Sequence, residues 1–303
     1  MKNNRYSIQN YRRLIRRDGQ VNRVERVGGS PWRFKDLYHG LITLSWMQFF
    51  SFIFALYFLT NTGFAIAYLL GGDCLVNAKH GSFQDAFFFS VQTLATIGYG
   101  AIYPGTMYAN ILVTLEAFVG LLGVAIVTGL AFARFSQPTA KVLFSNVAVI
   151  APYNGVLTLM YRTANQRNNQ IIEAQQMATI VRNEVSQEGE SLRRFYDLKL
   201  VRSQTPIFSL TWTVMHVIDE NSPLYGMSVE DFFQQEAEII ISLTGLDETV
   251  SQTIHARHSF IADEILWNYK FVDILSTTPD GRGMINYTRF HDVIPLLNST
   301  GKG

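Results

Sequence analysis

Two long apolar runs dominate the first half of the chain. Leu41–Leu70 contains no charged residue, and Met107–Phe135 has Glu116 as its only charge before Arg134. The first run would form a helix of roughly 45 Å, longer than the roughly 30 Å hydrocarbon core of a bilayer. A soluble helix of this length without a polar face would be very unusual. The pattern therefore predicts two membrane spans, at about 44–70 and 107–135.

A shorter apolar segment, Phe83–Ala95, lies between the two runs and has the composition of a short helix. It is too short to cross a bilayer, and re-entrant segments are common at this length. The glycine-rich stretch Thr93–Gly105 overlaps its end. Irregular backbone at membrane depth is tolerated only where it is buried in protein or lines a water-filled path. We therefore expect a pore helix at 83–95 followed by a loop that faces such a path.

From about residue 138 the pattern changes to short alternating runs separated by turn residues, which is typical of strands. The runs are 156–162, 178–185, 198–203, 207–218, 237–245, 251–260, 271–277 and 283–290. Asn-Gly in 152–156 and Asp-Gly in 278–283 predict hairpin turns. Strands at this spacing predict that 138–303 forms an all-β, immunoglobulin-like sandwich.

Composition and charge divide the chain in the same way. Charged residues make up 16% of the sequence, against roughly 25% in soluble domains, and the deficit falls between Leu41 and Ala133. Residues 1–31 are rich in Arg, which is compatible with nucleic acid but, next to an apolar run, favours a flank on anionic lipid.

Basic residues also follow the second span, whereas 71–106 contains only Lys79. The positive-inside rule therefore predicts that both termini are cytoplasmic. The single cysteine, Cys74, cannot form an intrachain disulfide. We expect no cleavable signal peptide, because the first apolar run begins only near Leu41.

The pentapeptide Thr96–Gly100, TIGYG, carries the chemistry of the first half. Two glycines flank one residue, and alternating backbone hands can turn successive carbonyls to one side. Four such loops around an axis replace the water shell of K⁺ in channels with the filter sequence TVGYG. We therefore expect K⁺ to bind at Thr96, Ile97, Gly98 and Tyr99 in a homotetramer. A re-entrant glycine turn without an ion is the alternative.

Other candidate chemistry is weaker. Glu116 lies within a span, where an ionisable group is functional by default; it either supports the filter from behind or snorkels to the interface. His255 and His258 are three apart on a predicted strand, so their side chains point to opposite faces and a metal site is disfavoured. No arginine-repeat voltage sensor or catalytic constellation is visible, and an enzyme is the least favoured class.

The chain resembles the inward-rectifier potassium channels, most closely their prokaryotic, KirBac-like branch. The resemblance covers about 32–290 and rests on four stretches: TIGYG, VIDENSPLYG at 217–226, SFIADEILW at 259–267 and the FARF that ends the second span. Members in animals carry an extracellular cysteine pair, which this sequence lacks. The resemblance implies an amphipathic slide helix at 32–43, a two-span pore domain at 44–137 and a cytoplasmic regulatory sandwich.

The resemblance also implies site residues. The pore and gate positions are Val124 and Phe132; the cytoplasmic vestibule positions are Glu173, Asp247 and Glu248; the apex loop is Thr249, Val250, Ser251 and Gln252; and the lipid-binding positions are Arg33, Lys35, Arg134 and Lys141. Val124, Val201 and Thr205 stand where strong rectifiers place acids, so weak block by polyamines or Mg²⁺ is expected. Ser136-Gln137 replaces the usual basic residue before Pro138, which leaves the sign of regulation by phosphoinositides open.

These features together predict a potassium-selective, lipid-regulated channel that needs no cofactor. Two alternatives remain from the residues alone. A nonselective or sodium-permeable channel would tend to lose the Gly98–Gly100 pattern. A two-span receptor with a binding β-domain would not need the filter, so valine at Gly98 would leave its signalling intact.

Overall fold

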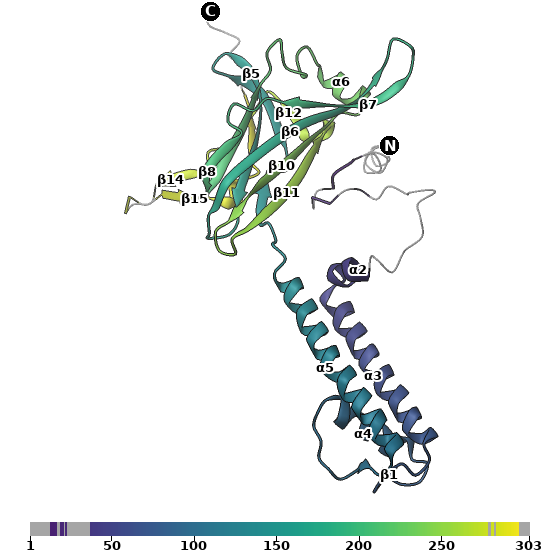
Figure 1. Ribbon diagram of the computed structural model, residues 1–303. Helices are drawn as coiled ribbons and strands as arrows, with labels where there is room; N and C mark the ends of the chain where they lie inside the picture. The colour runs from purple at the N-terminus through teal and green to yellow at the C-terminus, as the bar shows by residue number, and fades with distance from the viewer. Residues whose placement is uncertain are drawn as a thin grey trace, which may run out of the picture. The chain divides into compact units, whose positions relative to one another are not determined.

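The computed structural model describes residues 13–16, 19–20, 22, 37–277, 280–281 and 283–296. The chain divides into two compact units. The first, within residues 27–137, holds the long helices, and we call it the helical unit (Figure 1). The second comprises 138–303 and the described residues before residue 27, and we call it the strand unit.

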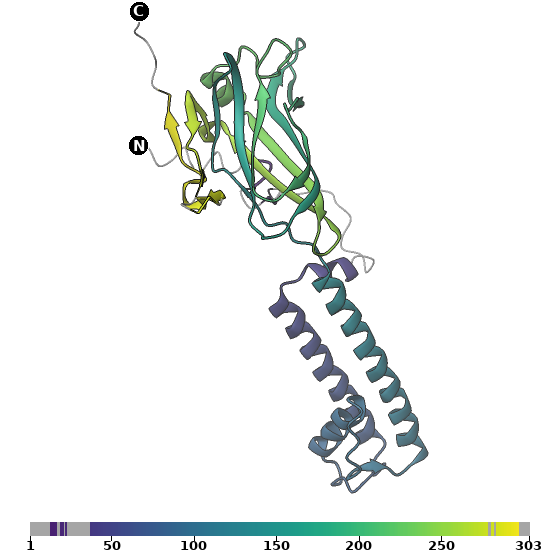
Figure 2. The same cartoon turned by 90° about the vertical axis from the view of Figure 1, so that its left-hand side faces the viewer.

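The helical unit consists of α2 (Leu37–Thr43), α3 (Trp46–Leu70), α4 (Phe83–Leu94) and α5 (Met107–Phe135), with the short antiparallel pair β1 (Leu75–Val76) and β2 (Tyr103–Pro104). α3 and α5 run side by side, and α4 lies against them at the end near β1 (Figures 1 and 2). Both α3 and α5 are long and apolar enough to cross a membrane.

The first apolar run is not one continuous helix. α2 ends at Thr43, and Ser45 begins α3 as its N-cap. Ser45 Oγ accepts from the Gln48 amide at 3.3 Å, while Gln48 Oε1 accepts from the Ser45 amide at 3.0 Å. This capping box satisfies two amides that the break leaves without partners. The span therefore begins at Trp46, and the predicted slide helix is described only from Leu37, since 32–36 lie outside the described residues.

Two further caps set the helix boundaries around the glycine-rich loop. Ser82 Oγ accepts from the Asp85 amide at the start of α4, and Thr106 Oγ1 accepts from the Ala109 amide at the start of α5. α4 ends at Leu94, one residue before the predicted end, and α5 coincides with the predicted range.

The described residues of the strand unit form fourteen strands and several short helices. The elements are β3 (Val142–Phe144), β4 (Ala148–Tyr153), β5 (Val156–Asn165), β6 (Ile171–Val185), β7 (Ser191–Leu198), β8 (Gln204–Phe208), β9 (Thr211–Val217), α6 (Val229–Gln234), β10 (Glu238–Asp247), β11 (Gln252–Ile261), η2 (Ala262–Glu264), β12 (Ile265–Trp267), β13 (Tyr269–Phe271), β14 (Leu275–Thr277), β15 (Gly283–Ile285), η3 (Tyr287–Arg289) and β16 (Val293–Pro295).

Two five-stranded sheets face each other across the main core. One has the order β11-β10-β6-β7 with β8 on β6, and the other has the order β12-β4-β5-β3 with β9 on β5. Fully buried side chains from both sheets fill the space between them, among them Leu159, Val214, Ile180, Ile239 and Phe260. The prediction of two long apolar helices followed by a β-sandwich is confirmed (Figure 2).

The details of the sandwich match the sequence pattern in part. Asn154 and Gly155, with φ of 51° and 80°, form the two-residue β4–β5 turn that was expected. Residues 198–203 were predicted as a strand, but β7 ends at Leu198 and β8 begins at Gln204. The run 207–218 is two strands, β8 and β9, and only the start of 283–290 is a strand.

Part of the basic N-terminal arm is buried in the strand unit. The amides of Leu14 and Ile15 donate to the Glu238 carboxylate at 2.8 and 3.1 Å. Arg13, which is 7% exposed, donates to Ser259 Oγ and pairs with Glu264 at 3.1 Å. The arm was expected to flank lipid. Its described residues instead contact the strand unit, where they supply the donors that the buried carboxylates of Glu238 and Glu264 need.

Candidate functional site

The filter segment, Thr96–Gly100, has an alternating backbone. Thr96, Gly98 and Gly100 have φ of 57°, 59° and 77°, while Ile97 and Tyr99 between them are not in the left-handed region. Such a φ is strained for a β-branched residue like Thr96, at a cost of about 1–3 kcal/mol, and strain of this kind gathers at functional sites. The alternation is the backbone pattern expected of a loop that turns its carbonyls to one side.

The end of α4 anchors the start of the filter segment. The amide of Thr96 donates to Thr93 O at 3.0 Å, and the amide of Ile97 donates to Gln92 O at 2.8 Å. The segment itself is exposed in the single chain, with Tyr99 at 75%. A backbone so open at membrane depth needs surrounding protein or a water path.

Glu116 is fully buried within the helical unit, so it does not snorkel to an interface. Tyr68 of α3 donates its hydroxyl to Glu116 Oε2 at 2.6 Å, and Ser90 of α4 contacts the other carboxylate oxygen. The expected partner was the filter loop, but the carboxylate binds side chains of α3 and α4 instead. Sequence reasoning missed Asn61, Tyr68 and Ser90, whose signal is their polarity inside apolar helices.

The two positions expected to line the pore lie on α5 and are exposed in the single chain. Val124 is 67% exposed and Phe132 is 71% exposed. Many apolar side chains of α3 and α5 are also exposed, including Phe54, Leu59 and Phe118.

Of the basic residues expected to bind lipid, Arg33 and Lys35 lie outside the described residues. The guanidinium of Arg134 is engaged in contacts within the protein. Its guanidinium donates to Leu41 O at 2.7 Å and Leu44 O at 2.5 Å. It also lies over the ring of Trp46, 4.6 Å from the centroid. These contacts hold the α2–α3 junction, where carbonyls at the end of α2 lack helical partners.

Lys141 is exposed in the strand unit and borders an open pocket of about 750 Å³. The same pocket is lined by His255 and Arg257. His255 is exposed and contacts Thr244, whereas His258 is buried and stacks on Phe144. The two imidazoles thus lie on opposite faces, as expected, and the described residues hold no group of three or more metal-ligating side chains.

The expected vestibule residues differ in environment. Glu173 and Glu248 are exposed, and Glu173 adopts a positive φ of 50° beside a register shift between β6 and β10. Asp247 was expected to join them, but it is only 2% exposed. Its carboxylate pairs with Arg167 at 3.1 Å and accepts from Asn169 at 2.7 Å.

These contacts decide the ionisation of Asp247. Burial works to raise its pKa, but hydrogen bonds from Asn169, the Thr249 amide and Arg167 outweigh burial and hold the pKa below its usual value. Asp247 is therefore an ionised anchor of the turn and not a solvated vestibule charge. The expected apex loop is the tight turn that follows it, with Ser251 at φ 52°, while Gln252 already belongs to β11.

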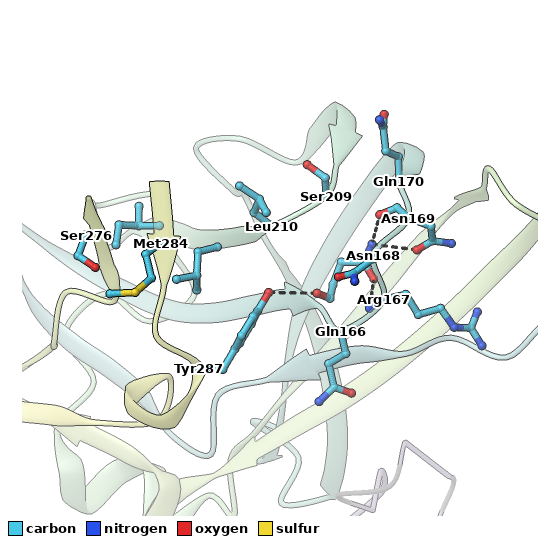
Figure 3. A pocket seen from close by; sticks show the side chains of 13 residues that line it. Gln166, Arg167, Asn168, Asn169, Gln170, Ser209, Leu210, Ser276, Met284 and Tyr287 are labelled. Atoms are coloured by element: carbon cyan, nitrogen blue, oxygen red, sulfur yellow. Dashed lines mark hydrogen bonds between the residues drawn. The ribbon is translucent and has the colours of Figure 1, made fainter. Parts of the chain in front are cut away.

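A pocket of about 740 Å³ lies in the strand unit (Figure 3). The polar loop Asn165–Gln170 forms one wall, and β14, β15 and Tyr287 form the other. Tyr287 donates its hydroxyl to Asn165 O at 3.2 Å, which joins the two walls (Figure 3). Sequence reasoning missed this loop, whose signal is the run of amide side chains between two strands.

Of the two expected substitutes for vestibule acids, Val201 is 65% exposed and Thr205 is 6% exposed. Thr205 Oγ1 donates to Ile207 O at 2.9 Å. Only Val201 is therefore open to solvent in the single chain.

Comparisons with known proteins cover both units. A family described as the inward rectifier potassium channel C-terminal domain matches residues 142–300, and one described as ion channel matches residues 37–137. The inward rectifier potassium channel Kirbac3.1 of Paramagnetospirillum magnetotacticum is 50% identical over 93% of this chain and 95% of its own length.

Two animal proteins are more distant. The G protein-activated inward rectifier potassium channel 1 of Gallus gallus is 30% identical over 92% of this chain. The inward rectifier potassium channel 18 of Homo sapiens is 32% identical over 86% of this chain. The matches span 61% and 62% of the length of these two relatives.

Proposed function

Because the chain belongs to the inward rectifier potassium channel family, we propose that four copies form one potassium-selective pore in the cell (inner) membrane. Both termini are cytoplasmic in this arrangement. The broad exposure of apolar side chains on α3 and α5 supports it, because these helices then face lipid or a neighbouring copy.

The alternating backbone of the filter segment is the observation that carries the proposal. Left-handed residues at Thr96, Gly98 and Gly100 allow successive carbonyls to face the axis. Four such segments bind dehydrated K⁺ at Thr96, Ile97, Gly98 and Tyr99, and the ion moves passively down its electrochemical gradient. The channel performs no covalent chemistry.

Gating is assigned to α5 and to the strand unit. Phe132 from four copies narrows the inner end of the pore and closes it by excluding water. Val124 faces the pore above it, and because valine offers no charge, block by polyamines or Mg²⁺ is weak. Ba²⁺ blocks at the filter.

Glu173 and Glu248 line the cytoplasmic vestibule in this proposal. Their exposed carboxylates, repeated in four copies, raise the local concentration of cations before the pore. Asp247 contributes by holding the apex turn Thr249–Ser251 in place, because its carboxylate accepts from the Thr249 amide and is itself fixed by the ion pair with Arg167.

Regulation by lipid is assigned to basic residues near the membrane. Lys141, Arg33 and Lys35 attract anionic head groups, including phosphoinositides, at about 1 kcal/mol each near the surface. Arg134 acts indirectly, because its guanidinium holds the α2–α3 junction.

Flux into liposomes tests the proposal. Liposomes that contain the purified full chain should take up rubidium but little sodium, and barium should block this uptake. Liposomes with a Gly98→Val variant should show no uptake. Equal rubidium and sodium uptake would refute selectivity while keeping a pore. A tetramer without flux in any lipid composition, with Gly98→Val behaving like the unchanged chain, would favour the receptor alternative.

A further inference from the structure

A polar cluster lies inside the helical unit, behind the filter segment. α3 contributes a buried stripe with Asn61, Ala65 and Tyr68 at 0%, 0% and 1% exposure. The spacing of four and then three residues places them on one helix face. Asn61 and Tyr68 therefore project polar groups from α3 toward α4 and α5.

α4 meets this stripe through Ser90. Its hydroxyl lies 3.1 Å from Asn61 Oδ1 and also contacts Glu116 Oε1. Tyr68 donates to the second carboxylate oxygen at 2.6 Å. All four side chains are at most 1% exposed. One carboxylate thus joins the two membrane spans to α4 by hydrogen bonds that water does not reach.

A second contact lies one helical turn further along the same two helices. Glu116 and Gly120 are four residues apart on α5, as Ser90 and Leu94 are on α4. A Cβ atom built on Gly120 would collide with the carbonyl oxygen of Leu94. At Gly123, by contrast, nothing lies within 4 Å of such an atom. Gly120 is therefore required for the close approach of α5 to α4, and the two helices are in contact at two successive turns.

The end of α4 that contacts Gly120 is the end that leads into the filter segment. Leu94 is the last residue of the helix, and the amides of Thr96 and Ile97 bond to the carbonyls of Thr93 and Gln92. A displacement of this end moves the first filter carbonyls with it. Shifts of this size matter because a filter discriminates between ions through the number and placement of its oxygens.

We propose that Glu116 is a positioning residue for ion selectivity, acting through hydrogen bonds to Tyr68 and Ser90 and supported by the Gly120–Leu94 contact. The inference rests on the proposed function of Thr96–Gly100. Glu116 touches no ion. Its role is to fix the end of α4, and a neutral amide of the same shape can fill that role.

The test is the ratio of rubidium to sodium uptake in liposomes, together with the barium concentration that halves rubidium uptake. Glu116→Ala should lower the ratio by about tenfold, a factor that corresponds to about 1.4 kcal/mol, and Glu116→Gln should restore most of it. Tyr68→Phe removes one hydroxyl only and should give a smaller loss in the same direction, so the test survives if Glu116→Ala does not assemble.

Gly120→Ala and Gly123→Ala form a matched pair on one helix. The first should lower the rubidium-to-sodium ratio, and the second should leave the ratio unchanged whatever it does to total uptake. A role in folding alone would reduce the yield of tetramers but not the ratio of the channels that form.

Three results would overturn the proposal. An unchanged ratio in both Glu116→Ala and Tyr68→Phe would mean that the cluster does not position the filter. Glu116→Gln as unselective as Glu116→Ala would mean that the charge acts and not the hydrogen bonds. Equal effects of the two glycine variants would mean that the contact between Gly120 and Leu94 does not position the filter. If the unchanged chain itself lacks selectivity, the proposed function fails instead.

Discussion

Replacing Tyr161 by phenylalanine should stabilise the strand unit, although it removes a polar group from the protein. Tyr161 lies on β5 in the main core and is 1% exposed. Its ring packs near that of Phe260, with centroids 6.0 Å apart. Among the described residues its hydroxyl has no hydrogen-bond partner. The ring therefore contributes to packing, while the hydroxyl is buried without compensation.

The magnitude follows from this environment. Burying a hydroxyl without a hydrogen bond costs about 1–3 kcal/mol in proteins. Tyr161→Phe keeps the ring and removes the penalty, so the free energy of unfolding should rise by about that amount. Tyr196→Phe is the control, because the Tyr196 hydroxyl donates to Glu184 at 2.7 Å. Losing that bond should lower the free energy of unfolding by about 1 kcal/mol.

The effect should also grow at alkaline pH. Burial raises the pKa of Tyr161 above its ordinary value of 10.0. The unfolded chain therefore releases this proton above about pH 10 while the folded chain keeps it, so wild-type stability is full below that pH and is lost as pH rises toward the folded pKa. At pH 11 the advantage of Tyr161→Phe should exceed its value at pH 8 by about 1.4 kcal/mol.

Urea unfolding of the full chain in detergent measures these differences. The fluorescence of Trp212 and Trp267, both in the strand unit, reports the transition at pH 8 and pH 11. A lower midpoint for Tyr161→Phe at pH 8 would refute the reasoning, because it would mean that the hydroxyl has a partner in the folded protein. An advantage that does not change with pH would refute the burial of the phenol.

Three further predictions concern conduction and the apex turn. Val124→Asp should strengthen voltage-dependent block by spermine in planar bilayers, and unchanged block would mean that Val124 does not face the pore. Phe132→Ala should raise rubidium uptake without changing its ratio to sodium, since it widens the gate and not the filter; lower uptake would contradict a gate at this position. Arg167→Met should destabilise the strand unit by about 1 kcal/mol at pH 7, since Arg167 is 36% exposed. The stability that Asp247 contributes above its unfolded pKa is lost as pH falls through its folded pKa. Without Arg167 the folded pKa rises, so this contribution is smaller and is fully lost at a higher pH; acid unfolding midpoints that coincide would contradict it.

The features that the sequence could predict are those set by local pattern. The two long apolar runs imply spans because no other environment accepts them. Asn154-Gly155 implies its hairpin because both residues tolerate positive φ. The filter segment stands out because Gly98 and Gly100 flank a single residue within an apolar region. In each case the physical cause lies within a few residues of its effect.

The features that the sequence could not predict depend on partners distant in the chain. Nothing near Asp247 marks it as buried, because its partner Arg167 lies 80 residues away. Arg134 reads as a lipid contact until Leu41 and Leu44 are seen to present carbonyls to it. The break at Ser45 has a local cause, but its capping box lies within an apolar run whose pattern predicts one continuous helix.

The contact between Arg13 and Ser259 has a consequence for biosynthesis, since the two residues are separated by 246 positions. Arg13 is synthesised before either of the helices α3 and α5, and Ser259 only after both. Because the pair must meet in one aqueous compartment, the intervening chain has to cross an even number of times. This contact therefore cannot form until most of the chain has been made, and it forms only in chains whose spans have inserted with the correct parity.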